Sequence, residues 1–182
     1  KLFLNAGPGY GGSCLPKDMK ALINFANSVG VKPILLDAVE NVNQKQIQQI
    51  VKTIEKKLSG VSSKRITIMG TAFKPDTDDV RDSISIELIK KLLKMKAKIT
   101  IYDPRATENT KRIFGDKIFY KKSAINALDN SQCAVFMTYW KEFERINDKS
   151  INGMKRKLII DCRRIFSKGR INAEYYALGI GK

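Results

Sequence analysis

The chain has 182 residues, 43% of them hydrophobic and 29% charged, a composition typical of a globular protein. No apolar run approaches the ~18 residues of a transmembrane helix, and no basic stretch with an apolar core marks a signal peptide. The formal net charge of +16 favours anionic partners, such as nucleic acid or phosphorylated small molecules. Because the basic residues are spread along the chain rather than clustered, we expect a solvated basic surface, and nucleic acid is not the favoured partner.

Three cysteines and no histidine limit the chemistry of the chain. Without a C-x-x-C pair or a histidine, no zinc site is expected, and we predict no metal. An odd number of cysteines argues against a disulfide framework and for a reducing compartment, which we take to be the cytoplasm. Cys133 opens a predicted apolar strand and Cys162 follows another, so we assign both to packing. Cys14 lies instead in a glycine-rich segment.

The first third of the chain is predicted to be a loop followed by two helices. Residues 1–16 are rich in glycine and lack periodicity. Apolar residues at helical spacing predict one helix over 16–29 and a longer one over 33–58, ended by Ser59-Gly60. A helix of about 25 residues with a continuous apolar stripe is typical of a segment that packs against a partner. That stripe comprises Leu35, Val39, Val42, Ile47, Ile50, Val51, Ile54 and Leu58.

From Arg65 onward, short β-branched runs alternate with helical pieces. This alternation is typical of a parallel sheet covered by helices on both faces. We therefore predict an α/β fold with two parts, a helical region over 1–59 and a Rossmann-like α/β domain over 60–182. The strands are expected at 65–69, 98–102, 117–120, 134–138 and 158–161, and the helices at 82–96, 106–114, 123–129 and 140–156.

Cys14 has the surroundings of a reactive thiol. Glycines in the preceding segment, Gly7 to Gly12, allow positive φ and let backbone approach a ligand closely. Cys14 comes directly before a predicted helix, whose N-terminal dipole favours a thiolate, and Lys17 adds a positive charge. Asp18 is an acidic group within reach that can act as a base. A glycine-rich turn with an inert cysteine is the alternative interpretation of the same residues.

A second candidate site follows the first strand of the α/β domain, over residues 70–83. Ligands of open α/β sheets bind at the carboxyl ends of strands, and this loop occupies such a place. Lys74 and Arg81 are cations that suit a phosphate, although the loop lacks a G-x-G-x-x-G motif. A surface loop held by salt bridges would contain the same residues.

At this point two motifs establish a resemblance. Residues 3–18, FLNAGPGYGGSCLPKD, resemble the active-site segment of UDP-glucose 6-dehydrogenases at every specified position. Residues 70–83, GTAFKPDTDDVRDS, resemble the C-terminal domain motif of the same family, in the expected order. Ser13 argues against the UDP-N-acetylmannosamine branch, which carries His there. GDP-mannose dehydrogenases share GGSCLPKD and stay an alternative.

Two further segments extend the resemblance. The helix over 33–58 is similar to the central, dimer-forming helix of the family, which implies a homodimer. Residues 160–164 resemble a D-G-R-N segment, with Cys162 in place of Gly and Arg164 in place of Asn. This departure leaves the role of Arg163 open.

The resemblance implies an enzyme that uses NAD to oxidise UDP-glucose to UDP-glucuronate in two hydride-transfer steps, through a cysteine thiohemiacetal and thioester. Cys14 would be the nucleophile, and Asp18 would handle the water or its proton. Lys17 and Arg81 would lie beside NAD. The nucleotide sugar would contact Phe3, Leu4, Asn5, Ala6, Gly7, Gly11, Lys74 and, from the facing subunit, Arg163.

The resemblance also implies a missing part. The family carries an N-terminal Rossmann domain for NAD, and no G-x-G-x-x-G follows a predicted strand in this chain. We expect these 182 residues to be part of a longer protein and to be inactive alone. A basic nucleic-acid-binding module and a purely structural dimerisation module are the alternatives of another class.

Overall fold

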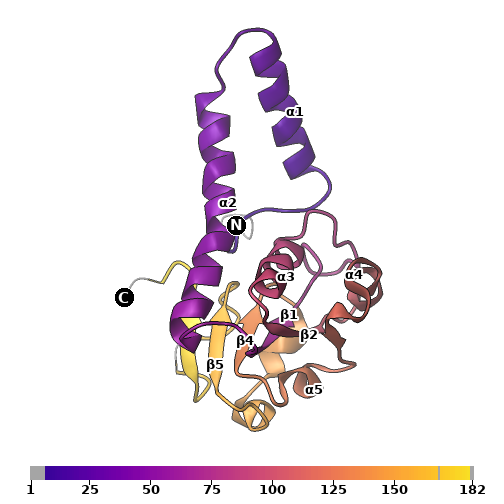
Figure 1. Ribbon diagram of the computed structural model, residues 1–182, viewed down its shortest axis with the longest axis vertical. Helices are drawn as coiled ribbons and strands as arrows, with labels where there is room; N and C mark the ends of the chain where they lie inside the picture. Colours follow the sequence, from indigo (N-terminus) through magenta and orange to yellow (C-terminus); the bar gives the residue numbers. More distant parts are fainter. Residues whose placement is uncertain (1–6, 168, 181–182) are drawn as a thin grey trace.

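The computed structural model describes residues 7–167 and 169–180, which form an α/β domain with a helical hairpin projecting from it (Figure 1). The hairpin consists of α1 (Leu15–Ser28) and α2 (Ile34–Leu58). Pro16 lies in the first turn of α1, where its missing N–H costs no hydrogen bond. Ser59, with φ of 52°, ends α2 in the left-handed conformation. Both predicted helices are therefore confirmed to within one residue.

The sheet has six parallel strands in the order β3-β2-β1-β4-β5-β6. This is the strand order of a doubly wound Rossmann-like fold, so the predicted fold class is confirmed. The order reverses between β1 and β4, and ligands of such sheets bind at the carboxyl ends of the strands at that point. The strands are β1 (Arg65–Met69), β2 (Lys98–Tyr102), β3 (Phe119–Tyr120), β4 (Cys133–Phe136), β5 (Leu158–Asp161) and β6 (Glu174–Ala177).

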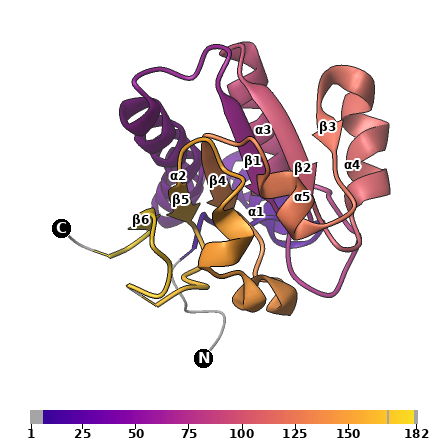
Figure 2. The same ribbon diagram turned by 90° about the horizontal axis from the view of Figure 1, so that it is seen from below.

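Helices cover both faces of the sheet. Figure 2 shows α2 and α3 on one side of the sheet, and α5 with the short 3₁₀ helices η3 and η4 on the other. The connecting elements are α3 (Ile84–Lys94), α4 (Thr107–Phe114), η2 (Gly115–Lys117), α5 (Ala124–Leu128), η3 (Lys141–Arg145) and η4 (Asp148–Ile151). No helix in the described part of the chain is long and apolar enough to cross a membrane.

In the second half of the domain one predicted helix is wrong and one strand was missed. The segment 140–156 is not one helix, because Asn147 interrupts it: its side chain accepts hydrogen bonds from Lys149 N and Ser150 N and caps η4. The strand β6 was not expected, since only half-buried residues follow Glu174 in it. It adds to the sheet beside β5.

The core lies between the sheet and its helices. The two cysteines assigned to packing, Cys133 and Cys162, are fully buried there, and burial raises the pKa of both thiols. The last turns of α2 also enter this core through Ile50, Ile54 and Leu58. The division of the chain at residue 60 stays a prediction, since α2 belongs to the hairpin at one end and to the domain core at the other.

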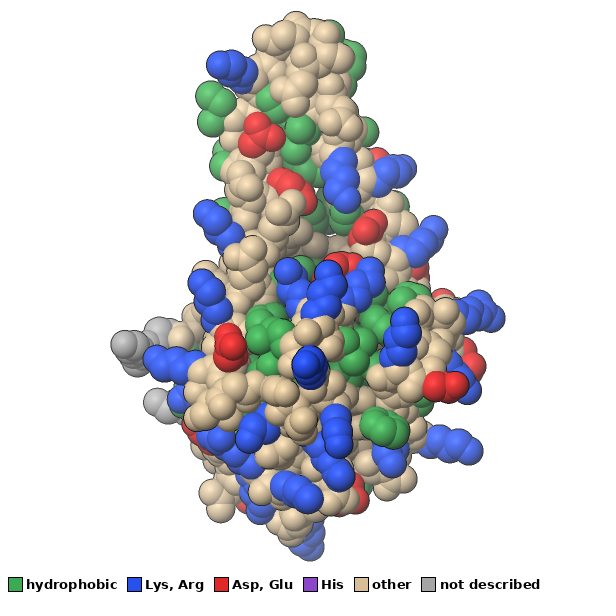
Figure 3. All heavy atoms as spheres, in the orientation of Figure 1, with side chains coloured by type: hydrophobic (Ala, Val, Ile, Leu, Met, Phe, Trp, Pro, Cys, Tyr) green, Lys and Arg blue, Asp and Glu red, His purple; other side chains and the backbone are tan. Residues whose placement is uncertain are grey.

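Charge is spread over the surface. Figure 3 shows Lys and Arg side chains distributed over the visible face of the domain, with apolar side chains exposed on the hairpin. The exposed apolar residues of the hairpin include Leu22, Phe25, Ile34, Leu35 and Val42.

Candidate active site

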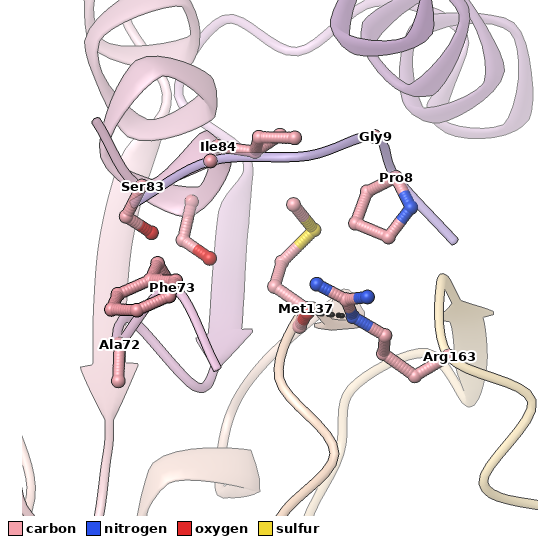
Figure 4. Close-up of a pocket in the computed structure, with 10 residues that line it drawn as sticks. Pro8, Gly9, Ala72, Phe73, Ser83, Ile84, Met137 and Arg163 are labelled. Atoms are coloured by element: carbon pink, nitrogen blue, oxygen red, sulfur yellow. Dashed lines mark hydrogen bonds between the residues drawn. The ribbon is translucent and has the colours of Figure 1, made fainter. Parts of the chain in front are cut away.

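The two motifs identified from the sequence meet at the carboxyl ends of β1 and β4. The glycine loop, residues 7–13, crosses this edge of the sheet and forms one wall of a small pocket (Figure 4). Because the strand order reverses here, the pocket lies where Rossmann-like folds bind nucleotides. It is lined by Pro8, Gly9, Gly11, Ala72, Phe73, Ser83, Ile84, Ser85, Met137 and Arg163.

Two glycines allow the motifs to touch. A Cβ at Gly11 would lie 2.4 Å from the Asp82 carbonyl oxygen. A Cβ at Gly12, where φ is +94°, would lie 2.6 Å from the Phe73 ring. Any side chain at either position would therefore push the glycine loop off residues 70–83.

The loop after β1 is held by a buried carboxylate that the sequence did not single out. Asp103, at the end of β2, accepts hydrogen bonds from Thr71 N at 2.7 Å, Ala72 N at 3.0 Å and Trp140 Nε1 at 3.1 Å. Its other oxygen accepts from the backbone of Arg105 and Ala106. Asp103 thus fixes the pocket wall, and its only sequence signal was an Asp-Pro pair closing a strand.

The glycine loop is also tied to α2. The side chain of Asn43 accepts a hydrogen bond from Tyr10 N at 2.8 Å and donates one to Tyr10 O at 3.0 Å. The Tyr10 hydroxyl donates to Glu40 Oε2 at 2.8 Å. Burial and this carboxylate raise the pKa of Tyr10 to about 12.

Cys14 is exposed and is the N-cap residue of α1. Its carbonyl accepts the first helical hydrogen bond, from Asp18 N at 2.9 Å, and its sulfur lies 3.8 Å from Ser13 Oγ. The thiol therefore stands at the positive end of a 14-residue helix. Asp18 lies one turn along the same helix and pairs with Lys17 at 3.2 Å on the exposed surface.

Arg163 lies inside the pocket. It follows β5, donates from Nε to Met137 O at 2.8 Å, and its guanidinium is 2.9 Å from where a Cβ of Gly7 would be. Burial lowers the pKa of its guanidinium, and no carboxylate of the described residues forms an ion pair with it. Arg163 thus meets the glycine loop of its own chain, and its contact with substrate from the facing subunit stays a prediction.

The predicted cations Arg81 and Lys74 are exposed, as Lys17 is. Arg81 forms an ion pair with Asp79 at 2.7 Å, which lowers the pKa of that carboxyl and raises the pKa of the guanidinium. The ammonium group of Lys74 lies 5.4 Å from the centre of the Phe73 ring. Four predicted substrate residues, Phe3, Leu4, Asn5 and Ala6, lie outside the described residues. In the described ranges, no group of three acidic, cysteine or histidine side chains could hold a metal ion.

Comparison with known families identifies the chain. Residues 67–168 match the UDP binding domain of the UDP-glucose/GDP-mannose dehydrogenase family, and residues 1–45 match the central domain of that family. The chain belongs to this family. The pocket between the glycine loop and residues 70–83 therefore joins segments of two family domains.

Relatives named UDP-glucose 6-dehydrogenase align with nearly the whole chain. It is similar to the UDP-glucose 6-dehydrogenase AglM of Haloferax volcanii, with 41% identity over 97% of the chain and 40% of the relative. It is 35% identical to the UDP-glucose 6-dehydrogenase TuaD of Bacillus subtilis, over 96% of the chain and 38% of that protein. The chain thus spans about two fifths of the length of these family members.

Solved structures of nucleotide-sugar dehydrogenases share the fold of the chain. A UDP-glucose dehydrogenase from the archaeon Pyrobaculum islandicum superposes with a TM-score of 0.85 and 31% identity, over 93% of the chain and 38% of that structure. A GDP-mannose dehydrogenase of Pseudomonas aeruginosa shares the fold with a TM-score of 0.78 at 24% identity, over 96% of the chain and 41% of that structure.

Proposed function

We propose that this chain supplies the catalytic cysteine and the nucleotide-sugar half of an NAD-dependent UDP-glucose 6-dehydrogenase. The observation that carries the proposal is the pocket at the strand-order reversal, where the glycine loop before Cys14 faces Arg163. Relatives named UDP-glucose 6-dehydrogenase, up to 41% identical over nearly the whole chain, support the substrate.

Arg163 is the best candidate for a phosphate partner. A half-buried guanidinium without a carboxylate partner among the described residues favours an anion, and its donors suit phosphate oxygens. Lys74, which is exposed beside the Phe73 ring that lines the pocket, is a second candidate cation. The missing side chains of Gly7 and Gly11 let Arg163 and the Asp82 backbone close on the loop, whose backbone we propose to lie along the sugar.

The proposed chemistry centres on Cys14. Its thiolate adds to the C6 aldehyde carbon, so that a C–S bond forms while the C=O π bond breaks and its oxygen takes up a proton. Loss of the C6 hydride, to the acceptor that NAD would supply, and of the hydroxyl proton leaves a thioester. Water then adds to the thioester carbon, the C–S bond breaks, and the sulfur leaves as thiolate. Asp18, one helical turn from Cys14, accepts the proton of that water.

Lys17 and Arg81 are the cations proposed for the NAD phosphates. Lys17 pairs with the exposed carboxylate of Asp18, a weak contact that a phosphate can replace. Arg81 forms a bidentate pair with half-buried Asp79 through Nε and Nη2, which leaves its Nη1 donors for a phosphate. NAD, when bound, would supply the hydride acceptor for both oxidations. We propose that the 182 residues need a further NAD-binding unit for turnover, and the chain's two-fifths share of its relatives supports this.

We also propose a homodimer, in the cytoplasm. The exposed apolar residues Leu35, Val39 and Val42 follow one face of α2 and would be covered by a second copy. Three free thiols support a reducing compartment. Leu35→Asp and Val42→Asp together should shift sedimentation from dimer to monomer, whereas a monomeric parent would contradict the dimer.

Calorimetric titration of the chain with UDP and GDP tests the nucleotide. We expect UDP to bind, GDP to bind at least tenfold more weakly, and Arg163→Met to abolish binding while exposed Arg145→Met does not. Tighter binding of GDP would favour GDP-mannose instead. Absence of binding by either nucleotide would contradict the assignment of this pocket.

A further inference from the structure

The glycine loop has one polar tether among the described residues. Apart from the Ser13–Cys14 contact between chain neighbours, the described residues join the loop to the rest of the chain by hydrogen bonds at Tyr10 alone. There Asn43 pairs with the backbone N–H and C=O, and Glu40 accepts from the hydroxyl. The close approaches at Gly7, Gly11 and Gly12 are steric. The position of the loop along α2 therefore depends on the inner face of that helix.

The tether, formed by Tyr10 with Asn43 and Glu40, is closely packed. A Cβ at Gly9, where φ is +113°, would lie 2.3 Å from Asn43 Oδ1. The Asn43 amide presents a donor and an acceptor to one residue, as a neighbouring strand would. Only Gly11, Gly12 and Ser13 separate Tyr10 from Cys14, so fixing Tyr10 limits where Cys14 can begin α1.

We propose that Asn43 is a positioning residue, which holds the Tyr10 backbone on α2 and thereby sets the glycine loop over Arg163 and Cys14 at its edge. The proposal rests on the proposed function in taking Cys14 as the nucleophile and the loop as the sugar side of the site. It does not give Asn43 contact with substrate.

Amide hydrogen exchange tests whether the tether operates in solution. We expect Asn43→Ala to lower the protection of the Tyr10 amide roughly tenfold or more, because its acceptor is lost. Asn41→Ala is the matched control, since Asn41 is exposed on the same helix. Equal protection of Tyr10 in both variants would overturn the proposal.

Asn43→Asp separates this role from a general loss of structure. A protonated carboxyl keeps both hydrogen bonds, whereas the carboxylate places an anionic oxygen against Tyr10 O. The protection factor of the Tyr10 amide should therefore be highest below about pH 3 and fall as the pH rises through the ordinary carboxyl pKa of ~4, reaching its lowest level by about pH 6. A profile as flat as that of the parent would contradict the proposal.

The titratable groups at this position are Glu40 on α2 and the Tyr10 phenol in the glycine loop. From α3, the side chain that reaches the adjacent Gly9 is the uncharged Ile84. Combining Asn43→Asp with Glu40→Gln assigns the pH dependence. It should persist in the double variant, and its disappearance would assign it to Glu40 and overturn the proposal.

Binding gives the functional readout. Calorimetry with UDP-glucose and with UDP should show that Asn43→Ala weakens UDP-glucose about fivefold or more but UDP less than twofold, since Arg163 lies outside the tether. An unchanged ratio of the two affinities would overturn the proposal. If the parent chain bound neither ligand, the proposed function would fail, while the exchange profiles would still decide whether the tether exists.

Discussion

The α/β domain and the α1–α2 hairpin place their apolar side chains in opposite ways. In the domain, Ile66, Leu88 and Val135 are fully buried between sheet and helices. In the hairpin, Phe25 is 63% exposed, Ile34 76% and Leu35 75%. The domain therefore carries its own core, whereas the hairpin presents an apolar surface of the kind that partners cover.

Helix α2 belongs to both regions. Ile50 and Ile54, near its C-terminus, are fully buried in the domain, while Val42, two turns earlier, is 57% exposed. The glycine loop lies at the junction, with Asn43 on one side and residues 70–83 on the other. The candidate site is thus fixed to the stable region at one wall and to the projecting helix at the other.

The largest expected effect is a loss of stability in the α/β domain when Asp103 is replaced. Asp103→Ala removes the acceptor of five hydrogen bonds and leaves buried donors at Thr71, Ala72 and Trp140 unpaired. We expect the free energy of unfolding to fall by about 3–5 kcal/mol. Urea denaturation measures it, with exposed Asp116→Ala as the control. A loss no greater than that of the control would show that Asp103 does not hold the pocket wall.

The next prediction compares the two halves of α2 directly. Ile50→Ala leaves a cavity in the domain core and should cost about 3 kcal/mol of unfolding free energy. Val42→Ala removes an exposed side chain and should change it by less than about 0.5 kcal/mol. Both are measured by denaturation at a concentration where the chain is monomeric. Similar losses of unfolding free energy in the two variants would contradict the difference in packing between the domain and the hairpin.

The smallest effects concern the pH dependence at the junction. Burial and Glu40 raise the pKa of Tyr10 to about 12, so the folded chain favours the neutral phenol. Its contribution to stability is full below the ordinary phenol pKa of ~10 and is lost as the pH rises through about 12. Glu40→Gln should bring the Tyr10 pKa partway back towards ~10, because burial persists.

Absorbance titration at alkaline pH, taken as the difference from Tyr10→Phe, measures this pKa. Glu142→Gln is the control, since Glu142 faces Tyr102 instead. A Tyr10 pKa unaffected by Glu40→Gln would mean that the hydroxyl is not held on α2.

Local patterns predicted most of the fold. Apolar runs ended by Gly70 or by Asp103-Pro104 located β1 and β2, and the stripe from Leu35 to Leu58 located α2. The error at 140–156 arose because the buried residues Phe143, Ile146 and Ile151 fall at the i, i+3, i+8 spacing of an amphipathic helix. A side-chain cap at Asn147 outweighed that apolar pattern.

The long-range contacts that shape the site could not be predicted from local sequence patterns. Both motifs of the site were identified, yet nothing in either indicated that Gly12 would lie against Phe73. Asn43 is 33 residues from Tyr10 and read as a polar position on an amphipathic helix. Asp103 read as the end of a strand. The side chains that position the site are those whose partners are set by the packing of α2 and β2, which no local pattern encodes.

The most direct test of the account is alkylation of Cys14 with iodoacetamide, followed by peptide mass spectrometry, with and without UDP-glucose. Cys14 should react alone, since Cys133 and Cys162 are fully buried and burial raises the pKa of both. We predict that UDP-glucose slows this reaction in a saturable way, and that Arg163→Met removes the protection. An alkylation rate unchanged at UDP-glucose concentrations that saturate the chain would contradict a site formed jointly by the glycine loop and residues 70–83.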